Sequence, residues 1–224
     1  MKYKLISIVL VMICTTIAFA EESIAIALKV KGDVELMRKE QVSKTKTGEE
    51  LVNKDELESK EDSFAALKFI DGSSVVKLFP NSILTINAFK EDGKLNKKNF
   101  LQFGELWAKV VKKTGDFEID TPTTVVSVKG TELFVTVNEK GETDLYTFDG
   151  EVHIRNKVDE NEAIVTEGQK AHSKGEGEII VSPIKKGDIS EEQQDLIESG
   201  VSNVLEIELE NDEGEKRTIK IEFE

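Results

Sequence analysis

The chain has 224 residues, a formal net charge of −14 at pH 7 and a single cysteine. The acidic charge opposes binding to nucleic-acid phosphates and to anionic lipid surfaces, so we expect no nucleic-acid partner. The length allows one sizeable hydrophobic core that needs neither disulfides nor a structural metal.

The first 20 residues have the pattern of a secretory signal peptide. A basic start at Lys2 and Lys4 precedes an apolar run over residues 5–17, and a small-x-small pattern ends at Ala20. The run is shorter than the ~20 apolar residues that span a bilayer. We therefore expect cleavage after Ala20, a mature chain that is periplasmic or secreted, and no membrane insertion after cleavage.

Two other interpretations of this segment are a short membrane anchor and a lipoprotein leader. The acidic pair Glu21-Glu22 directly follows the apolar run, whereas an anchor is normally followed by a basic flank. Lipidation of Cys14 would need a small residue before it, and that position holds Ile13. Cleavage after Ala20 would leave 204 residues with no cysteine and a net charge of −16, which excludes disulfides and thiolate catalysis.

After the leader, apolar and polar residues alternate with period two between short glycine, asparagine and aspartate interruptions. This pattern is typical of antiparallel strands in an all-β sandwich or barrel. Asp71-Gly72 and Asp149-Gly150 predict hairpin turns, because glycine tolerates the positive φ that such turns need. In chain order we expect strands over residues 24–30, 34–36, 64–69, 75–79, 82–89, 100–111, 117–119, 125–128, 133–137, 144–148, 152–154, 163–165 and 179–181.

The C-terminal segment differs from the rest of the chain. Ser190 and Gln193 predict a capping box at the start of a short helix, and Gly200 suits the position after it. A hairpin with one apolar face is expected next, and its apolar side chains are candidate binding residues: Leu205, Ile207, Leu209, Ile219, Ile221 and Phe223. We expect this face to dock on the chain's own domain, with docking on another protein as the alternative.

These patterns divide the chain into three parts. Residues 1–20 are the signal peptide, residues 24–183 form the β-sandwich domain, and residues 184–224 form a small appendage of helix and hairpin. The sequence does not predict the oligomeric state.

Few residues could support catalysis or metal binding. The chain has two histidines: His153 is expected on the exposed side of a strand, and His172 in a polar turn near Gly168. No serine lies in a G-x-S-x-G motif, and the few aromatic residues argue against a carbohydrate-cleaving site. We therefore expect no enzyme activity, no metal site and no cofactor.

The stretch from about Val30 to Gly168 resembles the FecR domain family. The motifs that carry the resemblance follow the family's order along the chain: Lys31-Gly32-Asp33-Val34, residues 63–69 with Asp71-Gly72-Ser73, Pro80-Asn81-Ser82, Gly104-Glu105-Leu106-Trp107, residues 117–122, residues 128–134, Gly150-Glu151-Val152 and Gly168-Gln169. The resemblance implies a periplasmic β-sandwich with jelly-roll-like connections.

The most specific signature residues are Thr121, Pro122, Gly130 and Thr131, and we interpret them as structural. Pro122 cannot donate to a strand ladder, and Gly130 suits a bulge or a sharp corner. The hydroxyls of Thr121 and Thr131 are expected to satisfy backbone groups that such corners expose.

In regulatory members of the family, this domain senses an outer-membrane transporter and signals through one membrane helix to a sigma factor. Here the apolar segment looks cleavable, so we expect an extracytoplasmic, non-catalytic module that binds another envelope protein. One alternative is a module that binds peptidoglycan or envelope glycan, with Trp107 as the stacking residue, although a lone tryptophan in an alternating strand is more often core. Another is a membrane-anchored signalling regulator, if the leader is not cleaved.

Overall fold

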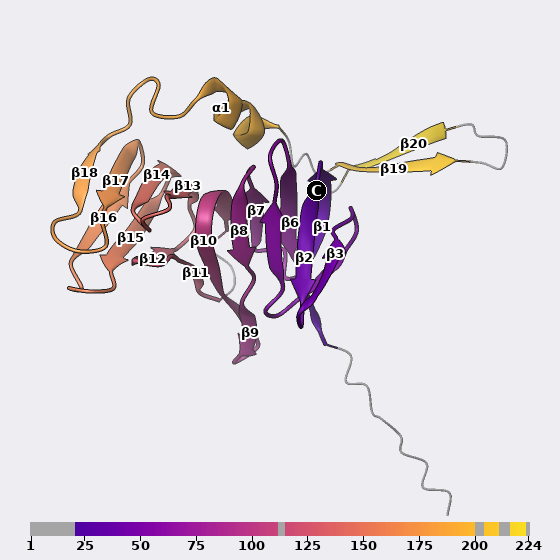
Figure 1. Cartoon of the computed structure of the whole chain (residues 1–224), viewed down its shortest axis with the longest axis horizontal. Coiled ribbons are helices and arrows are strands. Elements are labelled where there is room, and N and C mark those ends of the chain that lie inside the picture. The colour runs from indigo at the N-terminus through magenta and orange to yellow at the C-terminus, as the bar shows by residue number, and fades with distance from the viewer. Residues whose placement is uncertain (1–20, 112–114, 200–203, 211–215, 223–224) are drawn as a thin grey trace, which may run out of the picture.

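The computed structural model describes residues 21–111, 115–199, 204–210 and 216–222, and side chains only as far as residue 199. These residues form a sandwich of two β-sheets with one short helix on its outside (Figure 1). The predicted all-β fold is confirmed. The leader with Ala20 and Cys14, and the predicted helix end at Gly200, lie outside the described residues.

We call the two layers sheet A and sheet B. From edge to edge, sheet A consists of β4 (Glu50–Val52), β1 (Ser23–Lys31), β6 (Phe64–Phe69), β7 (Ser74–Leu78), the second part of β10 (Lys94–Val110), β13 (Glu132–Val137), β14 (Thr143–Asp149), β17 (Gln169–Ser173) and β18 (Ile180–Pro183). All of its pairings are antiparallel.

Sheet B has a comparable width. Its order is β3 (Gln41–Lys44), β2 (Val34–Arg38), β5 (Glu56–Ser59), β8 (Ser82–Thr85), the first part of β10, β11 (Phe117–Asp120), β12 (Thr124–Val128), β15 (Glu151–Asn156) and β16 (Glu162–Thr166). Strand β9 (Ala88–Glu91) pairs with the start of β10. The β10–β11 pair is parallel, and the other pairings of this sheet are antiparallel.

Strand β10 belongs to both sheets. Its first part, up to Phe103, pairs in sheet B, and from Gly104 onward it pairs in sheet A. Gly104 has a φ of +98°, and a Cβ there would lie 2.2 Å from the hydroxyl oxygen of Ser82. Only glycine allows the strand to pass this point, because any larger residue would collide with β8.

The chain passes back and forth between the sheets in hairpins. On either side of β10, pairs such as β6–β7 and β13–β14 lie in sheet A, while β11–β12 and β15–β16 lie in sheet B. Each new hairpin pairs with an earlier one in the same sheet, as β12 does with β15 and β14 with β17. The hairpins therefore cross repeatedly between the two layers, which is the arrangement meant by jelly-roll-like connections.

The two inner faces enclose the main core, which is mostly aliphatic. Leu67, Leu106 and Leu145 contribute from sheet A, and Leu57, Leu101 and Ile154 from sheet B; all are buried. The period-two alternation of the sequence therefore directs one set of side chains inward, as expected for a sandwich.

Several strands differ from the sequence-based expectation. The polar stretch after Arg38 contains β3, whose four residues are all exposed, and the short strands β4 and β5 were not predicted either. A solvated edge strand carries little apolar signal, which explains why β3 was missed. The expected strand over 82–89 is divided into β8 and β9, and His172 lies in strand β17 rather than in a turn.

The C-terminal part contains one helix, α1 (Glu191–Glu198), and a hairpin of β19 (Val204–Glu210) and β20 (Lys216–Glu222). The capping box forms as predicted: the Ser190 hydroxyl accepts from the backbone of Gln193, and the Gln193 side chain accepts from the backbone of Ser190. Strands β19 and β20 pair with each other in a separate two-stranded sheet. Within the described ranges, no helix has the length and apolar character needed to cross a membrane.

Candidate binding surface

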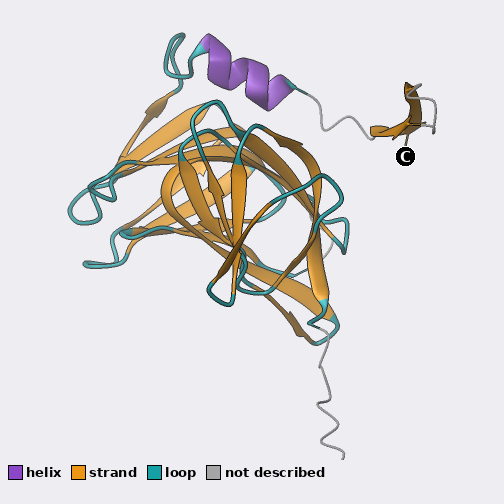
Figure 2. Cartoon of the chain, turned by 45° about the vertical axis from the view of Figure 1, so that its right-hand side comes forward, coloured by secondary structure: helices purple, strands orange, loops and turns teal. Residues whose placement is uncertain are grey.

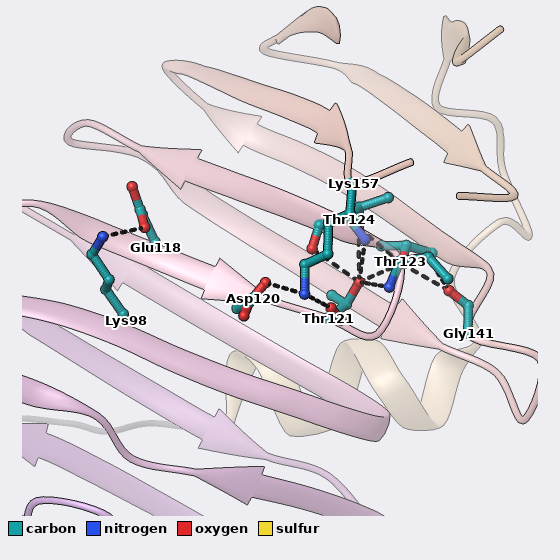
Figure 3. Close-up of polar contacts among 9 residues, drawn as sticks. Lys98, Glu118, Asp120, Thr121, Thr123, Thr124, Gly141 and Lys157 are labelled. Atoms are coloured by element: carbon teal, nitrogen blue, oxygen red, sulfur yellow. Dashed lines mark hydrogen bonds and ion pairs between the residues drawn. The ribbon is translucent and has the colours of Figure 1, made fainter. Parts of the chain in front are cut away.

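The first half of the signature forms a tight polar corner between β11 and β12 (Figure 3). The Thr121 hydroxyl accepts a hydrogen bond of 2.9 Å from the backbone N–H of Thr124 and lies 3.2 Å from the Thr143 hydroxyl. Lys157 donates to the Thr121 carbonyl and pairs with Asp120 at 2.6 Å. All three threonines are buried, so their hydroxyls satisfy one another and the backbone where the ladder ends.

The second half of the signature lies at the other end of β12. Gly130 has a φ of +71°, and the methyl group of Thr131 lies 2.7 Å from where a Cβ on Gly150 would be. The Thr131 hydroxyl is buried without a hydrogen-bond partner, so the expectation that it satisfies backbone groups is wrong. Its methyl side packs against the Gly150 turn instead. The two halves therefore shape two separate corners.

Other family motifs also meet in pairs. Ser82 lies against Gly104, and its hydroxyl accepts from the Glu105 N–H at 2.8 Å. A Cβ on Gly32 would lie 2.5 Å from the hydroxyl oxygen of Ser63, which accepts from the N–H of Asp33. These motif residues pack against one another's backbone, so the contacts give them a structural role.

The Asp71-Gly72-Ser73 turn anchors a buried lysine. Asp71 accepts from the backbone and the hydroxyl of Ser73, at 3.1 and 2.8 Å, and pairs with the ammonium group of Lys97 at 2.5 Å. Lys97 also donates to the Leu95 carbonyl, and its ammonium lies 5.6 Å from the centre of the Phe69 ring. A buried lysine with this many partners is a structural charge, because each partner offsets part of its desolvation.

The outer face of sheet A carries a row of directly opposed residues that we call the aromatic row. The register places Lys77 opposite Trp107, Trp107 opposite Phe134, Phe134 opposite Tyr146 and Tyr146 opposite Lys170. The ammonium groups at its two ends lie over aromatic rings, 4.6 Å from the centre of Trp107 and 6.0 Å from the centre of Tyr146. Phe79 extends the row, with its ring 5.1 Å from that of Phe134.

Residues Ile184–Ser199, which we call the strap, cover this row. Figure 2 shows α1 lying along the outside of the sandwich. Four strap side chains pack on the aromatic cluster without becoming fully buried: Ile184, Ile189, Leu196 and Ile197. The row is thereby shielded, and Trp107 is only 6% exposed. The glycan-stacking role considered for Trp107 therefore lacks an accessible ring in this structure.

Polar contacts fix the strap near both ends of the row. Asp188 pairs with Lys170 at 2.7 Å, and Gln193 donates to Glu105 at 2.8 Å. At the end of α1, the Lys77 ammonium donates to the carbonyls of Ile197 at 2.6 Å, Ser199 at 3.0 Å and Leu196 at 3.4 Å. The last carbonyls of a helix have no partners within it, so Lys77 supplies both hydrogen bonds and a favourable positive charge.

Burial also shifts the titration of groups along the row. It lowers the pKa of Lys77 to about 8 and raises the pKa of Tyr146 to about 12, because the charged forms lose hydration. The pKa of Glu105 is raised for the same reason, and the hydrogen bond from Gln193 opposes that shift.

The two histidines lie in different sheets. His153, in β15 of sheet B, is exposed beside Glu151, and His172, in β17 of sheet A, lies 2.8 Å from Asp144. Among the described residues, no group of three or more His, Cys, Asp or Glu side chains could hold a metal ion.

The candidate binding residues of the hairpin lie where only the backbone is described. The register sets Leu205 opposite Ile221, Ile207 opposite Ile219 and Leu209 opposite Arg217. Phe223 lies outside the described residues. No side-chain contact of this hairpin tests where it docks.

Sequence reasoning missed the aromatic row and Lys77. The sequence favoured a core position for Trp107, but the other members of the row come from four other strands, and only the strand register brings them together. The one local signal was a lysine within the apolar run from Ser74 to Phe79. A lysine at such a position is unusual unless it has a partner.

The fold thus defines an all-β sandwich whose sequence signature forms its corners. A family model described as FecR protein matches residues 55–153, from the turn before β5 to His153 in β15. This part of the chain matches the FecR family, and the resemblance predicted from the motifs is confirmed over these residues.

Two solved structures are similar to the chain. They are crystal structures, at 1.65 and 2.50 Å resolution, of a proposed anti-sigma factor from Parabacteroides distasonis ATCC 8503. Each has a TM-score of 0.49 and 17% sequence identity, and the alignment covers 57% of this chain and 59% of that chain. The chain therefore matches less than two thirds of their length. No curated protein matches it.

Proposed function

We propose that this chain is an extracytoplasmic, non-catalytic module that binds another protein of the cell envelope. The FecR domain would be its rigid scaffold, extending over residues 24–183, and residues 184–224 would be the appendage that meets the partner. The leader pattern of residues 1–20, with cleavage after Ala20, supports a periplasmic or secreted location.

The observation that carries this proposal is the separate two-stranded sheet of β19 and β20. A two-stranded hairpin is at best marginally stable in water, and its alternating sequence gives it one apolar face. Because β19 and β20 pair only with each other among the described strands, we adopt the alternative in which this face docks on another protein, where an added strand or sheet would provide both apolar contacts and backbone hydrogen bonds.

Site-specific photo-cross-linking in intact cells tests the proposal. A photoreactive residue at Ile207 should capture one envelope protein, identified by mass spectrometry, whereas the same residue at the exposed Val42 of β3 should not. An Ile207→Glu change should abolish capture of that protein by a probe at the neighbouring position 205. Cross-links that join Ile207 only to residues 21–199 of the same chain would show that the hairpin docks internally, contrary to the proposal.

Fractionation of the same cells tests the location. The mature chain should appear outside the cytoplasm with Glu21 as its first residue. A chain that retains residues 1–20 in the membrane fraction would instead favour the anchored signalling regulator.

A further inference from the structure

We propose that the strap, Ile184–Ser199, opens from the aromatic row while the sandwich stays folded, and that Lys77 is the contact that holds it closed. This inference does not depend on the proposed function, because it concerns only contacts within the chain.

The strap has little stability of its own. Helix α1 has eight residues, well short of the length at which a helix persists in water by itself. None of its side chains is fully buried, and Leu196 and Ile197 are only partly covered. Its closed position therefore depends on what the sheet offers it.

The sandwich, in contrast, has a main core to which no strap residue contributes. The main core lies between the two sheets and is a separate cluster from the aromatic row on the outside. Lifting the strap would expose Trp107, Tyr146 and their neighbours but leave the inter-sheet packing intact. Regions with few buried apolar contacts are those that open locally before global unfolding.

Lys77 supplies the basic group that the last turn of α1 lacks. The first turn has Glu191 and Glu192, which suit the positive end of the helix, but the last turn has no basic residue of its own. The Lys77 ammonium occupies that position from the sheet and donates to three carbonyls. Other charged groups near it are Glu132 on β13, Lys109 on β10 and Lys29 on β1.

Hydrogen exchange and fluorescence of the whole mature chain test this proposal. Trp107 is the only tryptophan and lies under the strap, so its emission and its quenching by acrylamide report opening directly. In the unmodified chain, amides of residues 194–199 should exchange through local opening, much faster than those of β14. Exchange of both segments at the rate of global unfolding would overturn the proposal.

A Lys77→Met variant keeps the length of the side chain but removes its charge and its hydrogen bonds. At pH 9.5 strap opening should rise about 10-fold, because methionine removes the amine that donates to the carbonyls at the end of α1. Trp107 should become more accessible to acrylamide, while β14 and β15 keep their protection. The control is Lys98→Met, which removes an exposed lysine of sheet B that pairs with Glu118 and not with the strap, and it should change neither readout.

Two results would overturn the role of Lys77. One is an unchanged exchange rate of the strap in Lys77→Met with Trp107 still protected. The other is an equal loss of protection in the strap, β14 and β15, which would mean that the strap and the sandwich unfold as one unit.

Discussion

Single residues of the FecR-like motifs determine how closely two backbone segments can pack. Gly104 is the clearest case, because β10 crosses from one sheet to the other beside Ser82 and leaves no room for a Cβ. The same residue also adopts a φ of +98°, which L side chains rarely adopt. Strain and steric conflict therefore coincide at one position.

Gly104→Ala should consequently destabilise the domain by about 3 kcal/mol or more, measured by urea unfolding followed by circular dichroism. Gly48→Ala is the matched control: Gly48 also has a positive φ, +85°, but open space where a Cβ would lie. That change should cost only about 1 kcal/mol, the strain without the collision. Equal losses of unfolding free energy in the two variants would show that the contact with Ser82 does not contribute to the effect.

The sequence predicted the identity of such residues better than their partners. Thr121 and Gly104 were singled out by their motifs, yet Thr143 and Ser82, which complete their contacts, lie in other motifs or in none. Lys77 was missed because its significance depends on Trp107 and on a helix about 120 residues later. Local patterns cannot show a contact that only the register creates.

At the scale of elements, the strap and the aromatic row form one unit whose closure depends on pH. Opening would return Lys77 from a pKa of about 8 to its ordinary value of 10.5, so opening binds a proton between these values. A rising pH therefore favours the closed strap in this window, because the neutral amine still donates to the α1 carbonyls and no longer carries the desolvation cost of the ammonium. Above pH 10, the raised pKa of Tyr146 acts in the opposite direction, because opening then releases a proton.

Between pH 7 and pH 9.5, the opening equilibrium of the strap should fall about 30-fold. The measurement is the protection of amides 194–199 by hydrogen exchange, corrected for the intrinsic pH dependence of exchange. Lys77→Met should remove this pH dependence of strap opening, because the titrating amine is absent from the variant. A steady rise of opening over the same range would contradict the lowered pKa of Lys77.

Elements with a strong alternating pattern were predicted well, and edge elements were not. The hairpin at Asp71-Gly72 and the capping box at Ser190 formed as expected, because each depends on a few neighbouring residues. Strand β3 escaped prediction since all its side chains face solvent, and β17 because its polar residues pair with Asp144 and Asp188 instead of filling a core.

At the scale of the whole molecule, β10 makes the two sheets one cooperative unit. Its first part is a central strand of sheet B and its second part a central strand of sheet A. A substitution that destabilises either part of β10 should therefore destabilise both sheets.

Leu101→Ala removes a fully buried side chain from the sheet B part of β10. We expect a loss of about 2–5 kcal/mol in the free energy of unfolding, and equal losses of amide protection in β14 of sheet A and β15 of sheet B. Val42→Ala, at an exposed position of the edge strand β3, is the control and should change neither. A loss confined to β15 would show that the sheets unfold independently.

Because hairpins alternate between the layers, such a domain can gain or lose whole hairpins at its edges. A newly acquired hairpin needs only one existing strand to pair with, so material can be added after β18 or lost there in whole hairpins while the crossing at Gly104 stays as it is. Relatives of this chain are then expected to vary in length at the ends of the domain and to keep the crossing at Gly104.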